Sequence, residues 1–96
     1  MDKIKVLVVD DESRMRKLVH DFLSRSNYEV VEAADGEEAI DIFYSDKSIS
    51  LVILDVMMPK MDGWEVCRQI RKDSNVPIIM LTAKSEEKDE LQGFDC

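Results

Sequence analysis

The sequence has few of the residues that mark several classes of protein. It contains two cysteines, Cys67 and Cys96, which are too few for a disulfide framework or a cysteine metal cluster. No apolar run approaches the ~20 residues that a helix needs to cross a bilayer. Residues 1–4 (MDKI) do not begin a secretory signal either. We therefore expect a cytoplasmic protein that does not associate with membranes.

Basic residues are also in short supply. The chain carries 13 lysines and arginines against 21 aspartates and glutamates, which gives a formal net charge of −8. Such a chain repels the phosphate backbone of nucleic acids. We therefore expect no direct binding of nucleic acid by this segment.

What is present is enough for one folded domain. The 96 residues are 45% hydrophobic and 35% charged, whereas disordered chains combine high charge with far fewer apolar groups. The sequence shows no internal repeat, low-complexity tract or linker. We expect a single domain that spans residues 1–96.

Apolar residues alternate between the spacing of strands and the spacing of helices. Short runs rich in valine, isoleucine and leucine predict strands at residues 4–9, 51–54 and 78–81, and their continuity is typical of a parallel sheet buried on both faces. Residues 28–33 are also prone to form a strand, but two glutamates interrupt them, as expected at the edge of a sheet.

Helical spacing separates these strands. A core-facing stripe is predicted in the first helix, at Met15, Leu18, Val19, Phe22 and Leu23. Asp35 and Asp62 begin the second and third helices with similar capping sequences, and Ser85 could cap a fourth. The order of elements is βαβαβαβα, which predicts an open α/β fold.

The handedness of the connections limits the topology. If the first crossover moves one way from the first strand and the next two move the other way, right-handed connections place the first helix on one face and the next two on the other. The order of the strands is then 2-1-3-4, as in flavodoxin-like folds, and ligands bind beyond the carboxyl ends of the strands where the order switches.

Acidic and hydroxyl side chains gather at these strand ends. Asp10 and Asp11 follow the first strand, Asp55 ends the third and Thr82 ends the fourth. Two carboxylates about 4 Å apart repel by ~4 kcal/mol at an effective dielectric constant of about 20, which a protein avoids by raising a pKa or by binding a cation. Oxygen ligands favour Mg²⁺, so the pattern predicts Mg²⁺-assisted phosphate chemistry.

Three motifs at these positions resemble the receiver domain of bacterial two-component response regulators. They are residues 8–12 (VVDDE), 54–63 (LDVMMPKMDG) and 77–83 (PIIMLTA). The resemblance covers the whole chain in the right order and spacing. It implies a doubly wound parallel sheet and a signalling switch that catalyses its own phosphorylation, not a turnover enzyme.

The resemblance also implies a role for each residue. Asp55 would accept a phosphoryl group from the phosphohistidine of a sensor histidine kinase. Asp11, Asp55 and the backbone carbonyl of Met57 would bind Mg²⁺ directly, and Asp10 would act through metal-bound water. Thr82 would donate its hydroxyl to the phosphoryl group and move inward once that group is present.

The family has five strands and five helices, so we expect a C-terminally truncated receiver without the fifth strand, the fifth helix or an effector domain. The fourth strand, residues 78–81, carries no charge or proline to protect an edge. One helix is also too narrow to cover a four-stranded sheet. The alternative function is therefore a phosphorylation-impaired fragment that forms a homo-oligomer by strand pairing or swapping.

Other interpretations have less support in the sequence. A phosphohydrolase with an aspartate nucleophile would need a second acid where Met57 stands, and the acidic rim would repel the phosphate of a flavin. His20 lies off the apolar stripe, so we expect a solvated helix residue. Cys67 is expected to be a small buried hydrophobe, and the methionines Met57, Met58 and Met61 are expected to shape the loop and the core.

Overall fold

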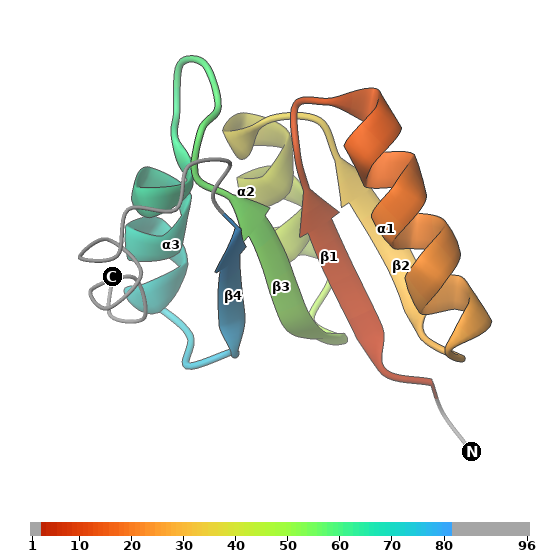
Figure 1. The fold of residues 1–96 in the computed structure, drawn as a ribbon. Coiled ribbons are helices and arrows are strands. Elements are labelled where there is room, and N and C mark those ends of the chain that lie inside the picture. Colours follow the sequence, from red (N-terminus) through yellow and green to blue (C-terminus); the bar gives the residue numbers. More distant parts are fainter. Residues whose placement is uncertain (1–2, 82–96) are drawn as a thin grey trace.

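The computed structural model describes residues 3–81, which form one parallel sheet flanked by helices (Figure 1). The strands are β1 (Lys5–Val9), β2 (Glu29–Ala33), β3 (Ile49–Asp55) and β4 (Ile78–Leu81), and the helices are α1 (Ser13–Arg25), α2 (Gly36–Ser45) and α3 (Gly63–Arg71). All pairs of neighbouring strands are parallel, in the order β2-β1-β3-β4. The predicted fold class and strand order are confirmed. The expected fourth helix lies outside the described residues.

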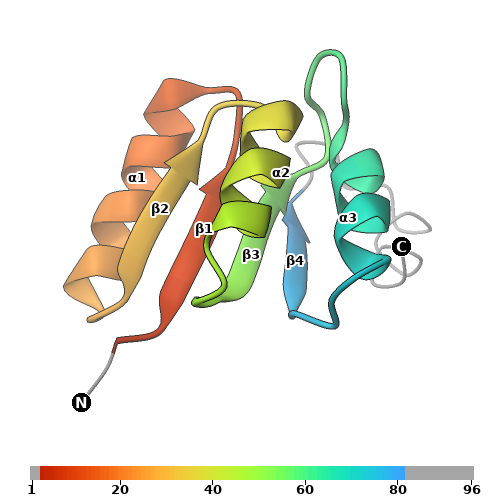
Figure 2. The same cartoon turned by 180° about the vertical axis from the view of Figure 1, so that it is seen from behind.

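The helices divide between the two faces of the sheet as the handedness of the crossovers requires. Helix α1 lies on one face, in front of the sheet in Figure 1. Helices α2 and α3 lie on the other face, which Figure 2 turns toward the viewer. The direction of winding therefore reverses at β1, the strand that pairs with both β2 and β3.

The core lies mainly between the sheet and the α2–α3 layer. Residues 6–9 of β1 are all buried, as expected for a central strand covered on both faces. The largest cluster of buried side chains combines residues of β1 and β3 with residues of the two helices, including Leu7, Leu54, Val66, Cys67 and Ile70. Cys67 is 2% exposed, which confirms its expected burial.

The opposite face is only partly covered. The stripe of α1 was predicted to face the core, yet Met15, Leu18 and Phe22 are 40%, 65% and 69% exposed, and α1 contains no buried residue. That prediction is wrong for these three side chains. A helix is 10–12 Å wide whereas four strands at about 4.8 Å span close to 20 Å, so one helix cannot cover the sheet.

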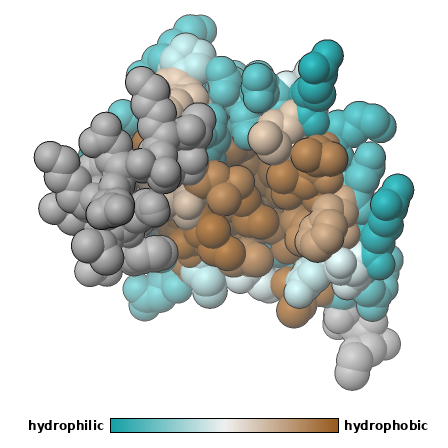
Figure 3. All heavy atoms as spheres, viewed as in Figure 1, coloured by the Kyte–Doolittle hydropathy of each residue, from teal (hydrophilic) through white to brown (hydrophobic). Residues whose placement is uncertain are grey.

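The uncovered part of the sheet includes β4. Ile78 and Met80 pack against the main core, so the alternate residues Ile79 and Leu81 point to the α1 face, where they are 46% and 40% exposed. A broad apolar surface is visible on this face (Figure 3). Among residues 3–81, no strand pairs with the outer edge of β4. The prediction of a half-bare face is confirmed for the described part of the chain.

Helices α2 and α3 begin where their capping sequences predict. Asp35 Oδ1 accepts a hydrogen bond from the backbone N–H of Glu38 at 2.8 Å, and Glu38 Oε1 accepts one from the N–H of Ala34 at 2.6 Å. Asp62 Oδ1 accepts from the N–H of Glu65 at 3.0 Å. These caps satisfy N–H groups that have no partner within the helix, and they fix the ends of the loops that leave β2 and β3.

Candidate functional site

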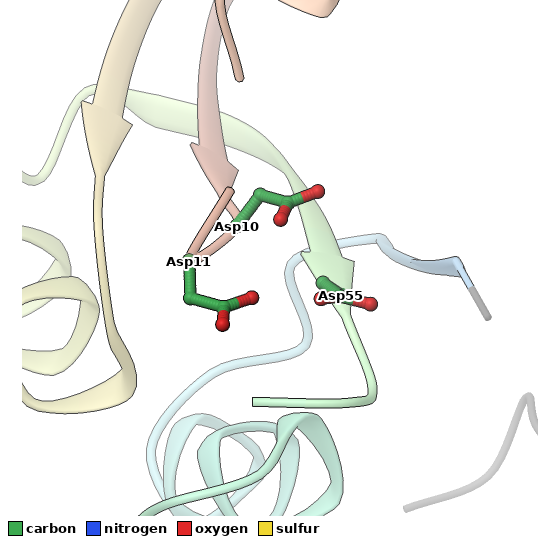
Figure 4. Close-up of side chains that lie close together, drawn as sticks. All are labelled: Asp10, Asp11 and Asp55. Atoms are coloured by element: carbon green, nitrogen blue, oxygen red, sulfur yellow. The ribbon is translucent and has the colours of Figure 1, made fainter. Parts of the chain in front are cut away.

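Three carboxylates meet where β1 and β3 end side by side. Val9 pairs with Leu54, so Asp10 and Asp11, which follow β1, lie beside Asp55, the last residue of β3. One oxygen of each carboxylate lies within 4.8 Å of the other two. Figure 4 shows the three side chains around one small space. The structure thus brings together the three aspartates that the sequence predicts to be neighbours.

The three aspartates differ in burial and in their hydrogen bonds. Asp10 is 8% exposed, and its Oδ1 accepts from the N–H of Glu12 at 2.9 Å. Asp55 is half-buried, and its Oδ1 accepts from the N–H of Met57 at 3.3 Å. Asp11 is exposed. Neither Asp10 nor Asp11 caps α1, because Glu12 occupies the N-cap position.

The loop from β3 to α3 holds Asp55 in place through backbone contacts. The N–H of Val56 donates to the carbonyl of Leu81 at 2.9 Å, and the N–H of Gly63 donates to the carbonyl of Val56 at 3.0 Å. A Cβ atom at Gly63 would lie 2.8 Å from the Cα of Val56 and closer still to the carbonyl oxygen of Asp55. Only glycine therefore allows this close approach.

An open hollow of about 330 Å³ adjoins the carboxylates. Its lining comprises Asp10, Asp11, Glu12, Met15, Asp55, Met57 and Leu81. The side chain of Met57 is 56% exposed, whereas Met58 is 8% exposed and belongs to the core. Of the three methionines expected to shape the loop and the core, Met58 and Met61 contact the core, and Met57 lies in the loop with its side chain exposed. The hollow leaves open space beside the Asp55 carboxylate.

Crowding of negative charge changes the acidity of the site. The pKa of Asp55 is raised from 3.8 to about 6, first by burial and then by the charges of Asp10 and Asp11, against the opposing effect of the Met57 N–H. The ionised form of Asp55 is therefore destabilised, and a bound cation would remove this destabilisation. An oxygen-only set of carboxylates fits a hard divalent cation such as Mg²⁺.

A model of the response regulator receiver domain matches residues 6–96. The chain belongs to this family. A receiver domain is a phosphoacceptor module of two-component signalling and not a turnover enzyme, so the phosphohydrolase alternative is excluded. Its acidic triad is of the kind that holds Mg²⁺ in this family, and the residues of this receiver fit such an ion.

Two curated relatives illustrate the similarity of sequence. The transcriptional regulatory protein ResD of Bacillus subtilis is 51% identical over 94 residues, which are 98% of this chain and 39% of that protein. A probable transcriptional regulator, ycf27 of Porphyridium aerugineum, is 50% identical over 95 residues, which are 99% of this chain and 39% of the relative. The chain thus spans less than two fifths of these relatives.

A solved structure illustrates the similarity of fold. The chemotaxis protein CheY4 of Vibrio cholerae is 36% identical and superposes with a TM-score of 0.88, over 96% of this chain and 78% of that one.

Within residues 3–81 of this receiver, no helix combines the length and the apolar character that crossing a bilayer requires.

Two of the predicted site roles, those of Thr82 and of the Met57 carbonyl, stay predictions. Thr82 lies outside the described residues. The role of the Met57 carbonyl as a metal ligand stays a prediction, although its residue lines the hollow.

Trp64, in the first turn of α3, lines a neighbouring hollow with Met57 and Asp62, so its indole is well placed to report on this loop.

Side chains of α1 and β2 support the site, and the sequence motifs did not predict them. Arg16 donates to the backbone carbonyl of Asp10 at 2.7 Å and to Glu32 Oε1 at 3.2 Å. His20 was predicted to be solvated, but it is half-buried and its Nδ1 lies 2.7 Å from Glu32 Oε2, within ion-pair distance but outside hydrogen-bond geometry. The glutamate on the edge strand β2 was the available signal, because a partly buried arginine needs an acidic partner.

Proposed function

We propose that this receiver is a phosphorylation-dependent switch in which Asp55 accepts a phosphoryl group from the phosphohistidine of a sensor histidine kinase. The observation that carries the proposal is the grouping of three carboxylate oxygens within 4.8 Å, beside an open hollow. These oxygens come from the ends of two neighbouring strands, at the point where ligands bind in open α/β sheets.

The proposed reaction is an in-line transfer. A carboxylate oxygen of Asp55 attacks the phosphorus, and an O–P bond forms as the P–N bond to the donor imidazole breaks. The bonding electrons leave with the imidazole nitrogen, so the product is an acyl phosphate on Asp55. Bound Mg²⁺ supplies positive charge that offsets the charge of the acceptor and the phosphoryl oxygens. Asp10 and Asp11 would hold it.

The positions of the other groups support this chemistry. The N–H of Met57 holds the Asp55 carboxylate at 3.3 Å, on the side of the hollow. With a pKa of about 6, Asp55 is mostly ionised at neutral pH and so available as a nucleophile. We further propose that the Met57 carbonyl completes the ligand set and that the Thr82 hydroxyl contacts the transferred group.

The similar proteins suggest what the switch controls. ResD is a transcriptional regulatory protein and ycf27 a probable transcriptional regulator. We propose that phosphorylation of Asp55 likewise governs an effector that acts on transcription. The receiver itself has a net charge of −8, so its contribution is regulatory, without direct contact to DNA.

Phosphorylation by a small acyl phosphate donor in the presence of Mg²⁺ tests the proposal. Mass spectrometry should detect one phosphoryl adduct that hydroxylamine removes, because acyl phosphates react with this nucleophile. Asp55→Asn should give no adduct. Asp41→Asn, at an exposed position of α2, is the matched control and should be modified like the wild type. An unmodified wild type, or an adduct that persists in Asp55→Asn, would overturn the proposal.

A second candidate function is self-association through β4 and the bare face. Ile79 and Leu81 of β4 are 46% and 40% exposed, and Leu18 and Phe22 of α1 are 65% and 69% exposed. Exposed apolar strands at a sheet edge favour pairing with a second copy. Light scattering across a dilution series should detect a dimer that Ile79→Lys weakens. A compact monomer at every concentration would refute this function.

A further inference from the structure

The backbone of Asp10 is fixed from both sides by groups of other elements. Its N–H donates to the carbonyl of Ala33 in β2 at 3.2 Å, and its carbonyl accepts from Arg16 Nη1 in α1 at 2.7 Å. Its side-chain Oδ1 accepts from the N–H of Glu12 at 2.9 Å. The side chain of Arg16 thus holds the backbone of the corner between β1 and α1, which carries both Asp10 and Asp11.

The guanidinium of Arg16 is itself held in place. The side chain of Arg16 is 17% exposed, although α1 contains no buried residue. Its Nε donates to Glu32 Oε1 at 3.2 Å, and the other oxygen of Glu32 lies 2.7 Å from His20 Nδ1. Glu32 pairs with Val8 in the register of β2 and β1, so it lies beside the part of β1 that directly precedes Asp10. Such supported, charge-assisted contacts are geometrically specific.

We propose that Arg16 is a positioning residue for the divalent cation site. Arg16 fixes the Asp10 peptide, Glu32 fixes Arg16, and the corner thereby presents the carboxylates of Asp10 and Asp11 toward Asp55. This inference rests on the proposed function, because it concerns the same cation. Groups that orient the ligands of a metal commonly change its affinity by 10–100-fold when they are altered.

Simple electrostatics predicts the opposite effect. Arg16 is a positive charge beside a site that binds a cation, so its removal alone should tighten Mg²⁺ binding. Loss of positioning should weaken binding instead. Lysine keeps the charge but has neither the planar shape nor the several fixed donors of a guanidinium. Arg16→Lys therefore separates the two effects without a change in net charge.

Titration with Mg²⁺, followed by the emission of Trp64, tests the inference. We expect Arg16→Lys to weaken Mg²⁺ binding about tenfold and Arg16→Gln to weaken it at least as much. Arg14 is an exposed arginine of the same helix. Arg14→Gln removes the same charge as Arg16→Gln and should tighten Mg²⁺ binding slightly. Wild-type affinity in Arg16→Lys, or tighter binding in Arg16→Gln, would overturn the inference.

Hydrogen exchange of the metal-free protein supplies a readout that does not need the metal. The N–H of Glu12, bonded to Asp10 Oδ1, should exchange faster in Arg16→Lys than in the wild type. The N–H of Glu38, which donates to Asp35 Oδ1 in the N-terminal cap of α2, should not change. Equal acceleration at both amides, or at neither, would contradict a local positioning role. A wild type that fails to bind Mg²⁺ would overturn the proposed function and this inference with it, whereas a wild type that binds Mg²⁺ and whose Glu12 N–H is insensitive to Arg16→Lys would overturn this inference alone.

Discussion

The two ends of the sheet place aspartates in opposite surroundings. At the carboxyl ends of the strands, burial and the charges of Asp10 and Asp11 raise the pKa of Asp55 to about 6. At the amino ends, hydrogen bonds from Ser48 and Lys5 lower the pKa of Asp46 to about 2. One end therefore favours a protonated carboxyl or a bound cation, and the other favours a carboxylate.

The contacts explain this difference. Asp46 Oδ1 accepts from the hydroxyl of Ser48 at 2.6 Å and from its N–H at 3.0 Å, while Oδ2 accepts from Lys5 Nζ at 2.9 Å. Both carboxylate oxygens of Asp46 therefore accept from donors of the protein. The carboxylates at the other end crowd one another instead. The ionised Asp46 at the amino ends therefore stabilises the fold. The crowded carboxylates at the carboxyl ends destabilise it until a cation binds.

The largest effect is expected from Gly63→Ala at the carboxyl ends. The new Cβ would lie 2.8 Å from the Cα of Val56, and the backbone of Asp55 and Val56 cannot yield without moving the end of β3. Overpacking of this kind costs about 1–3 kcal/mol. We expect urea denaturation to show that loss, and Mg²⁺ titration to show weaker binding, because Asp55 is displaced.

Gly36→Ala provides the comparison for this prediction. There the nearest atoms to a new Cβ are Cγ2 of Val66, at 2.9 Å, and the Cβ and carbonyl oxygen of Met61, at 3.0 Å, so the contacts are longer than at Gly63 and none involves Asp55 or Val56. The loss of stability should be smaller and Mg²⁺ affinity should be retained. If Gly36→Ala weakens Mg²⁺ binding as much as Gly63→Ala does, the close approach at Gly63 does not hold the site.

A smaller effect of the opposite sign is expected from Asp55→Asn. The raised pKa means that the folded protein keeps a proton which the unfolded chain releases, so the stability of the metal-free wild type should fall as the pH rises from about 4 to about 6. The asparagine variant lacks this fall. Because Asp55 is partly solvated, we expect a gain of about 1 kcal/mol or less at neutral pH.

Thermal unfolding at several pH values in a chelating buffer measures this effect. Mg²⁺ should stabilise the wild type and have little influence on Asp55→Asn. Asp41→Asn removes a charge from an exposed position of α2 and should leave the pH profile of the wild type unchanged. A wild type whose stability rises between pH 4 and pH 6 would contradict the assignment of the raised pKa to Asp55.

The sequence predicted the fold well where local signals were strong. The continuous apolar runs identified β1 and β4, and the capping residues Asp35 and Asp62 identified the starts of α2 and α3. The carboxylates of the site were also predictable, because parallel strands bring their carboxyl ends to one edge. Motif and topology together were sufficient for these features.

Features that depend on packing between distant segments were not predictable. The spacing of Met15, Leu18 and Phe22 indicates an apolar face of α1, but it does not show whether other residues cover that face. In the structure these three side chains are exposed. The contacts of Arg16 and His20 with Glu32 require the register of β2 against β1. Such pairs follow from tertiary structure, which a periodic pattern does not specify.

The smallest expected effect concerns the amino ends of the strands. Because the pKa of Asp46 is lowered, its contribution to stability should be complete above about pH 4 and should disappear as the pH falls toward about 2. Ser48→Ala removes the hydroxyl donor and should return the pKa of Asp46 part of the way to 3.8, as carboxyl NMR titration would measure. Ser50→Ala, at an exposed position nearby, should leave it unchanged. An Asp46 pKa that ignores the Ser48 hydroxyl would mean that Lys5 alone distinguishes this end of the sheet from the other.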